Sequence, residues 1–155
     1  MSDDVLSVIP TDPYWQPAQA AAERATALAT ALAPGRRAGL PPDIQVNWHE
    51  RPNVVDCGAY LEWITCPHCS GMLDPGWWTG LVEAHATRGF DTLAADLPCC
   101  GTASTLDTLN YHWPCGFARF EIAIWNSERE SFTDDELTTF AEALGHPVRQ
   151  IVAHI

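Results

Sequence analysis

Apolar and polar residues alternate with a period of two in several stretches of the chain, a pattern typical of β-strands with one buried face. The alternation is clearest at residues 119–125, where Phe120, Ile122 and Ile124 occupy every second position. Shorter stretches predict further strands over residues 5–9, 44–48, 59–63 and 148–155.

Three other segments repeat apolar residues at helical spacing and predict α-helices. These segments cover residues 18–33, 75–88 and 133–144. Local signals mark their starts, because Asp74 is a typical N-cap residue and Thr133 and Glu136 form a capping box. The stop signals that follow the three segments are Pro34-Gly35, Gly89 and Gly145.

The order of the predicted elements favours an α+β fold of the ferredoxin-like type. With residues 66–115 set aside, the order is strand–helix–strand–strand–strand–helix–strand, which is close to the split βαβ arrangement. We therefore expect an antiparallel or mixed sheet with two helices on one face. Residues 66–115 would form a zinc-knuckle insertion that carries a helix of its own. The 155 residues fit a single domain, residues 1–155, with a real hydrophobic core.

Two short cysteine turns stand out within this insertion. The first is Cys-Pro-His-Cys-Ser-Gly at residues 66–71, and the second is Pro-Cys-Cys-Gly at residues 98–101. A Cys-x-x-Cys pair with Pro and a trailing Gly aims two sulfur atoms at one point, which is typical of half a zinc site. We predict that one Zn²⁺ is bound by the cysteines of both turns, namely Cys66, Cys69, Cys99 and Cys100.

The second turn departs from the usual spacing of such sites. Cys99 and Cys100 are adjacent, and the 29 residues 70–98 separate them from Cys69. Neighbouring side chains diverge in extended backbone, so a turn is needed to bring both sulfurs to one metal. If only one of the two binds, the fourth ligand could be one of four other residues: Cys115, His112, His85 or His68.

The number of ligands decides between a structural and a catalytic role for this metal. Four thiolates complete the tetrahedron and leave no position for water, which favours a structural site. A site with three cysteines and a histidine would instead favour a small zinc-dependent hydrolase, with His112 or His85 near the metal. Without a metal, Cys99 and Cys100 could act as a thiol redox pair.

Other residues that could carry chemistry have simpler structural explanations. A nucleophilic pair of Cys115 and His112 lacks a recognised catalytic context, and their loop is expected to pack aromatic residues against the zinc region. His49-Glu50-Arg51 lies at the end of a predicted strand, where such exposed groups are common. The tryptophans near the metal turns are expected to fill gaps in the core rather than to line a ligand groove.

The charge of the chain limits its partners. Twenty acidic residues outnumber eight basic ones, so the formal net charge is −12. Such a surface repels nucleic-acid phosphates and anionic membranes and favours basic partners. Residues 1–4 lack the basic segment and apolar run of a signal peptide, and no stretch approaches a membrane span. We therefore expect a cytoplasmic protein whose six cysteines are thiols or metal ligands.

The motifs Cys-Pro-His-Cys, Pro-Cys-Cys-Gly and Gly-Phe-Ala-Arg-Phe together resemble a group of uncharacterised bacterial zinc-knuckle proteins, chiefly from high-GC soil bacteria. The resemblance covers about residues 57–155. It implies a metal site at the four cysteines Cys66, Cys69, Cys99 and Cys100, and it brings no established activity.

These observations favour a non-enzymatic, zinc-stabilised protein-binding module. A concrete form is an accessory or immunity-type protein that binds a basic protein partner and neither nucleic acid nor membrane. The small zinc hydrolase and the thiol redox protein are the alternatives.

Overall fold

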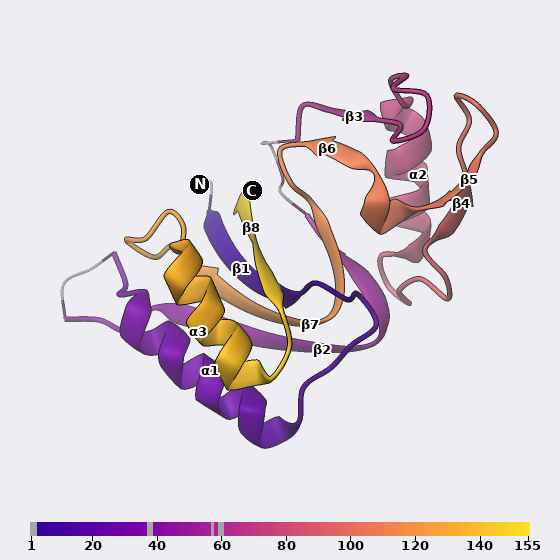
Figure 1. Ribbon diagram of the computed structural model, residues 1–155. Coiled ribbons are helices and arrows are strands. Elements are labelled where there is room, and N and C mark those ends of the chain that lie inside the picture. Colours follow the sequence, from indigo (N-terminus) through magenta and orange to yellow (C-terminus); the bar gives the residue numbers. More distant parts are fainter. Residues whose placement is uncertain (1–2, 37–38, 57, 59–60) are drawn as a thin grey trace.

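The computed structural model describes residues 3–36, 39–56, 58 and 61–155, and a main sheet with two helices lies beside a smaller lobe (Figure 1). In chain order the elements are β1 (Asp4–Pro10), α1 (Gln19–Leu32), β2 (Asp43–Val55), β3 (Trp63–Thr65), α2 (Pro75–His85), β4 (Ala94–Asp96), β5 (Ala103–Thr105), the 3-10 turn η1 (Leu106–Thr108), β6 (Asn110–His112), β7 (Gly116–Trp125), α3 (Asp134–Leu144) and β8 (Val148–His154).

Within the described residues, the main sheet has four strands in the order β2-β7-β1-β8, and every neighbouring pair is antiparallel. In the central pair, Val8 lies opposite Ile122 and Leu6 lies opposite Ile124. Because side chains two positions apart point to the same side of a strand, these residues share one face. The predicted α+β class is confirmed, and the sheet is antiparallel rather than mixed.

Helices α1 and α3 lie side by side on this apolar face of the sheet (Figure 1). Helix α1 contributes Ala25 and Ala29, whose small side chains are fully buried, and α3 contributes Phe140 and Leu144. Loss of the buried Phe140 ring would cost about 3–5 kcal/mol of folding free energy. The expectation of two helices on one face is confirmed. No helix in the described part of the chain combines the length and apolar character that a membrane crossing requires.

The ends of α3 follow the local signals in the sequence. The Glu136 N–H donates to the Thr133 hydroxyl at 3.2 Å, and the Thr133 N–H donates to the Glu136 carboxylate at 2.9 Å. The helix ends at Gly145, whose φ of 83° lies in the left-handed region that favours glycine. The predicted capping box and stop are confirmed.

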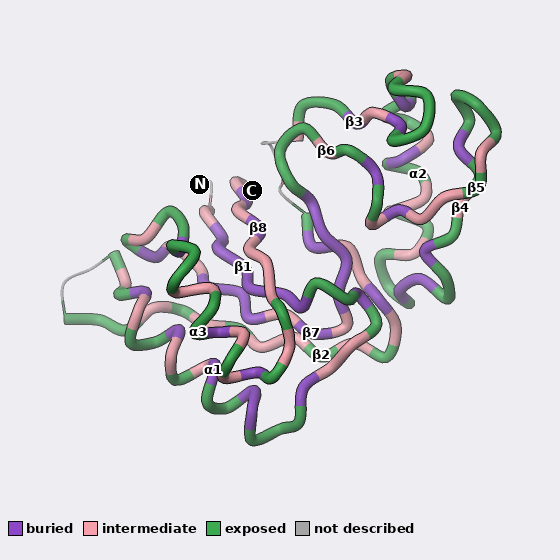
Figure 2. The backbone as a smooth tube through the Cα atoms, viewed as in Figure 1, coloured by how far each residue is buried: buried purple, intermediate pink, exposed green. Residues whose placement is uncertain are grey.

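The chain between β2 and β7 forms the smaller lobe, which we call the inserted lobe (described residues 61–115). In the described part it contains α2, η1 and two short antiparallel pairs, β3–β6 and β4–β5. Leu93, Leu97 and Leu106 are buried at its centre, in one cluster with Phe117 and Ile151 of the main sheet. Figure 2 shows the buried positions continuing from β7 toward this lobe. The lobe and the sheet therefore share a hydrophobic core.

Most differences from the sequence-based expectations lie in or near the inserted lobe. The strand expected over 59–63 begins later, at Trp63, and runs to Thr65, because Leu61 and Glu62 lie outside any strand. As expected, it leads directly to Cys66, and residues 59 and 60 lie outside the described residues. Helix α2 ends at His85 rather than at residue 88. The chain then reaches Gly89, the expected stop, in the left-handed conformation.

Strand β2 is longer than the alternation predicted, since it continues past residue 48 to Val55. Its register against β7 shifts between Trp48 and Asn53, a stretch that contains Pro52. Proline has no N–H for the ladder, which explains why the regular pattern breaks here. The Pro52 carbonyl instead accepts a bond from the Phe90 N–H at 2.8 Å, so this part of β2 holds the inserted lobe.

Candidate metal centre

The first cysteine turn, residues 66–71, follows β3 and is closed by two backbone hydrogen bonds. The Cys66 N–H donates to the Gly71 carbonyl at 2.9 Å, and the Ser70 N–H donates to the Cys66 carbonyl at 3.0 Å. Ser70 has a φ of 62°, an uncommon left-handed conformation for a residue other than glycine. This tight turn directs Cys66 and Cys69 to the same side.

The second turn, residues 97–102, lies between β4 and β5 and repeats the same geometry. The Leu97 N–H donates to the Thr102 carbonyl at 3.0 Å, and the Gly101 N–H donates to the Leu97 carbonyl at 2.7 Å. Gly101 has a φ of 70° and matches Ser70 of the first turn. The equivalence places Cys100 where the first turn has Cys69, Leu97 where it has Cys66, and Cys99 where it has His68.

The two turns bring four sulfur atoms together, and among the described residues this is the only group suited to hold a metal ion. The Sγ atoms of Cys66, Cys69, Cys99 and Cys100 all lie within 4.8 Å of one another. The Cys69–Cys99 distance is 3.5 Å, and the Cys66–Cys100 and Cys99–Cys100 distances are 3.8 Å. Four sulfurs bound tetrahedrally to zinc at about 2.3 Å would lie about 3.8 Å apart, so the donor set fits that ion.

Backbone N–H groups of the first turn point at its sulfur atoms. The N–H groups of His68 and Cys69 donate to Cys66 Sγ at 3.3 and 3.4 Å, and the Gly71 N–H donates to Cys69 Sγ at 3.4 Å. Such bonds favour the charged thiolate over the thiol, and the thiolate is the form that binds metals. The turns therefore prepare the sulfurs for a cation.

The thiols of Cys66, Cys99 and Cys100 differ in pKa. Desolvation raises the pKa of Cys66, but hydrogen bonds from the N–H groups of Cys69 and His68 and from the neighbouring thiols together leave that pKa below its ordinary value. Hydrogen bonds from the side chain and backbone of Thr102 lower the pKa of Cys100 to about 7. Desolvation and the neighbouring sulfurs raise the pKa of Cys99 to about 12. Four crowded thiols resist joint ionisation, so a bound cation would be needed to hold all four as thiolates.

The other residues considered as a fourth ligand lie in different surroundings. Cys115 is buried in the core, where its Sγ lies 3.4 Å from the Val55 carbonyl. His112 stacks on Trp63, and His85 stacks on Phe90, each with ring centroids within 4.6 Å. His68 is exposed within the first turn and contributes its backbone N–H to Cys66. None of Cys115, His112, His85 and His68 belongs to the four-sulfur group.

The other candidates for chemistry also take part in structural contacts. Cys115 lies in the core whereas His112 is exposed, so the two do not form the kind of paired site a nucleophile requires. His49 lies inside the long β2 strand, and its Nδ1 is 2.9 Å from the Asn53 side chain. Arg51 forms an ion pair with Asp91 at 2.6 Å. The tryptophans differ in exposure: Trp78 is buried, whereas Trp48, Trp63 and Trp113 have about two fifths of their surface exposed.

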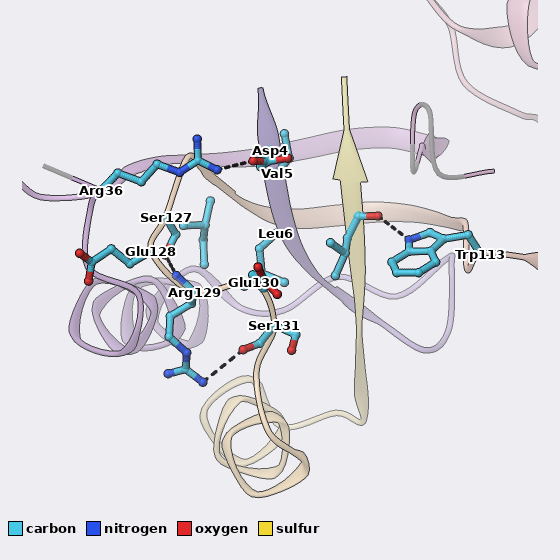
Figure 3. Close-up of a pocket in the computed structure, with 12 residues that line it drawn as sticks. Asp4, Val5, Leu6, Arg36, Trp113, Ser127, Glu128, Arg129, Glu130 and Ser131 are labelled. Atoms are coloured by element: carbon cyan, nitrogen blue, oxygen red, sulfur yellow. Dashed lines mark hydrogen bonds and ion pairs between the residues drawn. The ribbon is translucent and has the colours of Figure 1, made fainter. Parts of the chain in front are cut away.

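A pocket of about 430 Å³ lies at the end of the main sheet, between β1, β8 and the loop that precedes α3 (Figure 3). Leu6 and Val152 form part of its lining, and Arg36, which pairs with Asp4, lies at its rim. None of the four clustered cysteines lines it. Its two arginines, Arg36 and Arg129, already pair with Asp4 and Glu136. The pocket and the cysteine centre are therefore separate features.

Sequence reasoning missed the support that Thr102 gives to a sulfur, and it used Gly71 only as a signal of the first turn. A Cβ atom on Gly71 would lie 3.2 Å from Cys69 Sγ, so the absence of a side chain leaves room for that sulfur. The Thr102 hydroxyl lies 3.2 Å from Cys100 Sγ. A signal was present, because aligning the two prolines, Pro67 and Pro98, makes these residues equivalent in the two turns.

Comparison of the chain with protein-family models, with curated proteins and with solved structures gives no significant match. The resemblance expected from the motifs therefore identifies no family, and the structure supports only the four-cysteine cluster.

Proposed function

We propose that Cys66, Cys69, Cys99 and Cys100 bind one Zn²⁺ as a structural site. The observation that carries the proposal is the spacing of their sulfurs, all within 4.8 Å and 3.5–3.8 Å for three of the pairs, which matches the edge of a zinc–thiolate tetrahedron. Four thiolates fill the coordination sphere and leave no position for a reacting water, so the zinc would stabilise the fold rather than catalyse.

The zinc would act as a crosslink within the inserted lobe. It would join the turn after β3 to the turn after β4, and the chain between the two turns carries α2. Each of these turns borders a strand of only three residues. Such short strands bury little surface, so a metal crosslink would replace packing that the lobe lacks.

We infer for the main sheet a ferredoxin-like arrangement with the inserted lobe added between its second and third strands. The order β2-β7-β1-β8, the antiparallel pairing and the two helices on one face support this inference. A kinship with the bacterial zinc-knuckle proteins and a cytoplasmic location remain proposals, supported by the cysteine motifs and by the reduced thiols of the four clustered cysteines.

As its function, we propose that the protein is a non-enzymatic binding module for a basic protein partner, in the manner of an accessory or immunity-type protein. The net charge of −12 supports a basic partner. Trp63, Met72 and Trp113 of the inserted lobe are exposed and would offer apolar contact area beside this charge. The zinc would then keep the lobe in one shape for recognition.

The metal proposal is tested by metal analysis of the purified protein and by cobalt(II) substitution. We expect one zinc per chain and, after substitution, the intense sulfur-to-metal absorption and tetrahedral spectrum of four thiolates. A spectrum with fewer sulfurs and a bound water would favour the hydrolase, and a metal-free protein with a Cys99–Cys100 disulfide would favour the redox alternative.

The partner proposal is tested by affinity capture from the native host with zinc-loaded and zinc-free protein. We expect the loaded form to retain a basic protein, and we expect the binding to weaken as salt is raised. Equal retention by the zinc-free form, or binding that is indifferent to salt, would contradict the proposed role of charge and zinc.

A further inference from the structure

Cys99 differs from the other three cysteines in its place within the turn. In the matched turns, the first and fourth positions hold Cys66 and Cys69 in one case and Leu97 and Cys100 in the other. Leu97 is buried in the core and cannot serve as a ligand. Cys99 stands at the third position, equivalent to the exposed His68, and supplies the fourth sulfur from there.

This position leaves Cys99 without the hydrogen bonds that support the other sulfurs. Cys66 Sγ accepts two backbone N–H bonds, and Cys69 Sγ accepts one. Cys100 Sγ is supported by Thr102. Among the described residues, the contacts of Cys99 Sγ are with the sulfurs of the other three cysteines, and no backbone N–H donates to it.

Hydrogen bonds to a metal-bound thiolate draw electron density from the sulfur and make it a poorer nucleophile. A thiolate without them keeps its full reactivity, provided that reagents can reach it. Cys99 meets both conditions, because it is exposed as well as unsupported. Cys69 and Cys100 are exposed but supported, and Cys66 is buried.

We propose that Cys99 is the reactive ligand of the zinc centre and the site at which hydroperoxides oxidise it, with Cys69 as the resolving cysteine. This inference rests on the proposed zinc site and names a regulation of that site. Cys69 is chosen because its Sγ lies 3.5 Å from Cys99 Sγ, closer than Cys100 Sγ at 3.8 Å. Oxidation of Cys99 would break the zinc crosslink of the inserted lobe.

The reaction has two steps. With hydrogen peroxide, the Cys99 thiolate attacks one oxygen; the S–O bond forms, the O–O bond breaks, and hydroxide leaves as the sulfur becomes a sulfenic acid. The Cys69 thiolate then attacks the Cys99 sulfur; the S–S bond forms, the S–O bond breaks, and a second hydroxide leaves. Two protons from solvent convert both hydroxides to water. Two thiolates remain for the zinc, which is released.

The experiment exposes zinc-loaded protein, verified by metal analysis, to hydrogen peroxide and follows zinc release with a chromogenic chelator. Tryptic cleavage after Arg88 and Arg119 places Cys69 and Cys99 on different peptides, so their disulfide links two peptides. Fragment spectra of the linked pair distinguish the Cys69–Cys99 bond from one between Cys66 and Cys100, which lie on the same two peptides. We expect this linked pair to appear together with zinc release. A Cys99–Cys100 disulfide would link no peptides and would overturn the choice of Cys69.

Matched variants test the role of Cys99 itself. Cys99→His and Cys69→His each keep three thiolates and offer an imidazole as the fourth ligand. We expect peroxide to release zinc about tenfold more slowly from Cys99→His than from Cys69→His, the lower end of outer-shell effects on metal sites. Equal rates would overturn the inference.

Alkylation tests the reactivity of Cys99 in the natural protein, so it remains informative if the histidine variants fail to bind zinc. Brief alkylation of the zinc-loaded natural protein with iodoacetamide should modify Cys99 before the other three, as read from fragment spectra that separate Cys99 from Cys100. Uniform modification of zinc-loaded protein overturns this inference alone. Protein that binds no zinc at all overturns the proposed function as well.

Discussion

The Sγ atoms of Cys66 and Cys100 lie 3.8 Å apart although 34 positions separate the two residues in the chain. One is buried and the other is exposed, so the sulfur cluster lies at the border between the core of the inserted lobe and solvent. The contact joins two turns that have the same backbone geometry.

Single substitutions should show by zinc content that the four clustered cysteines bind the metal and that the other cysteines and histidines do not. We expect Cys66→Ser and Cys100→Ser to reduce bound zinc from one per chain to near zero, because serine is a poor zinc ligand. Cys115→Ser and His112→Ala should keep full occupancy, since neither residue belongs to the cluster. Metal analysis after gel filtration measures the result. Zinc loss in either control variant would mean that the ligand set is wrong.

Chelation should loosen the inserted lobe before the main sheet. The core beneath α1 and α3 is a separate hydrophobic cluster and contains none of the four cysteines. With free zinc at about a hundred times its dissociation constant, binding should add about 2.7 kcal/mol to the unfolding free energy of the lobe. Hydrogen exchange should therefore show α2, β4 and β5 losing protection on chelation while β1 and β7 keep it. Equal loss in both regions would show that zinc stabilises the whole chain as one unit.

The start of α3 should make stability depend on pH in the acid range. The guanidinium of Arg129, together with the Thr133 N–H, lowers the pKa of Glu136 from 4.5 to about 2. The folded state thus favours the ionised carboxylate, whose contribution is complete above about pH 4.5 and is lost as the pH falls toward 2.

This pH dependence is measured by thermal unfolding of the natural protein and Glu136→Gln. The difference in melting temperature should be largest above pH 5 and should shrink as the pH falls through the range given by the two pKa values. Glu142→Gln on the same helix is the control, because Glu142 has no ion-pair partner among the described residues. A constant difference between natural protein and Glu136→Gln would contradict the assignment.

Replacing either of two glycines near α2 with alanine should change the free energy of unfolding, in opposite directions at the two positions. Gly89 has a φ of 78°, and a Cβ there would lie 2.9 Å from the Arg51 Cβ and 3.0 Å from the Pro52 carbonyl oxygen. We expect Gly89→Ala to cost about 1–3 kcal/mol of unfolding free energy, through backbone strain and this close approach.

Gly80 is the matched position, because it lies inside α2 and a Cβ there would meet nothing within 4 Å. Gly80→Ala should stabilise the protein by about 1 kcal/mol, the usual gain of alanine over glycine in a helix. Urea unfolding at saturating zinc measures both variants. Shifts in the same direction would show that the contact between Gly89 and β2 does not hold the lobe.

The elements with strong local signals could be predicted from the sequence. The capping box of Thr133 and Glu136 set the start of α3, and the alternation around Ile122 marked β7. These signals act within a few residues, through hydrogen bonds and side-chain spacing, and so they can be read from one segment. By contrast, β4 and β5 have three residues each, too few for any period. Their pairing depends on contacts with the rest of the lobe.

The sequence by itself determined the main helices, the central strands and the four cysteines that could hold a metal. Only the tertiary structure decided whether the adjacent Cys99 and Cys100 turn toward one centre. Burial of Leu97 fixes the start of their turn in the core, and the left-handed Gly101 closes it. The facing turn then meets it at the distance that a tetrahedral ion requires. Neighbouring sulfurs can converge only when long-range packing imposes such a turn, and residue spacing carries no information about that packing.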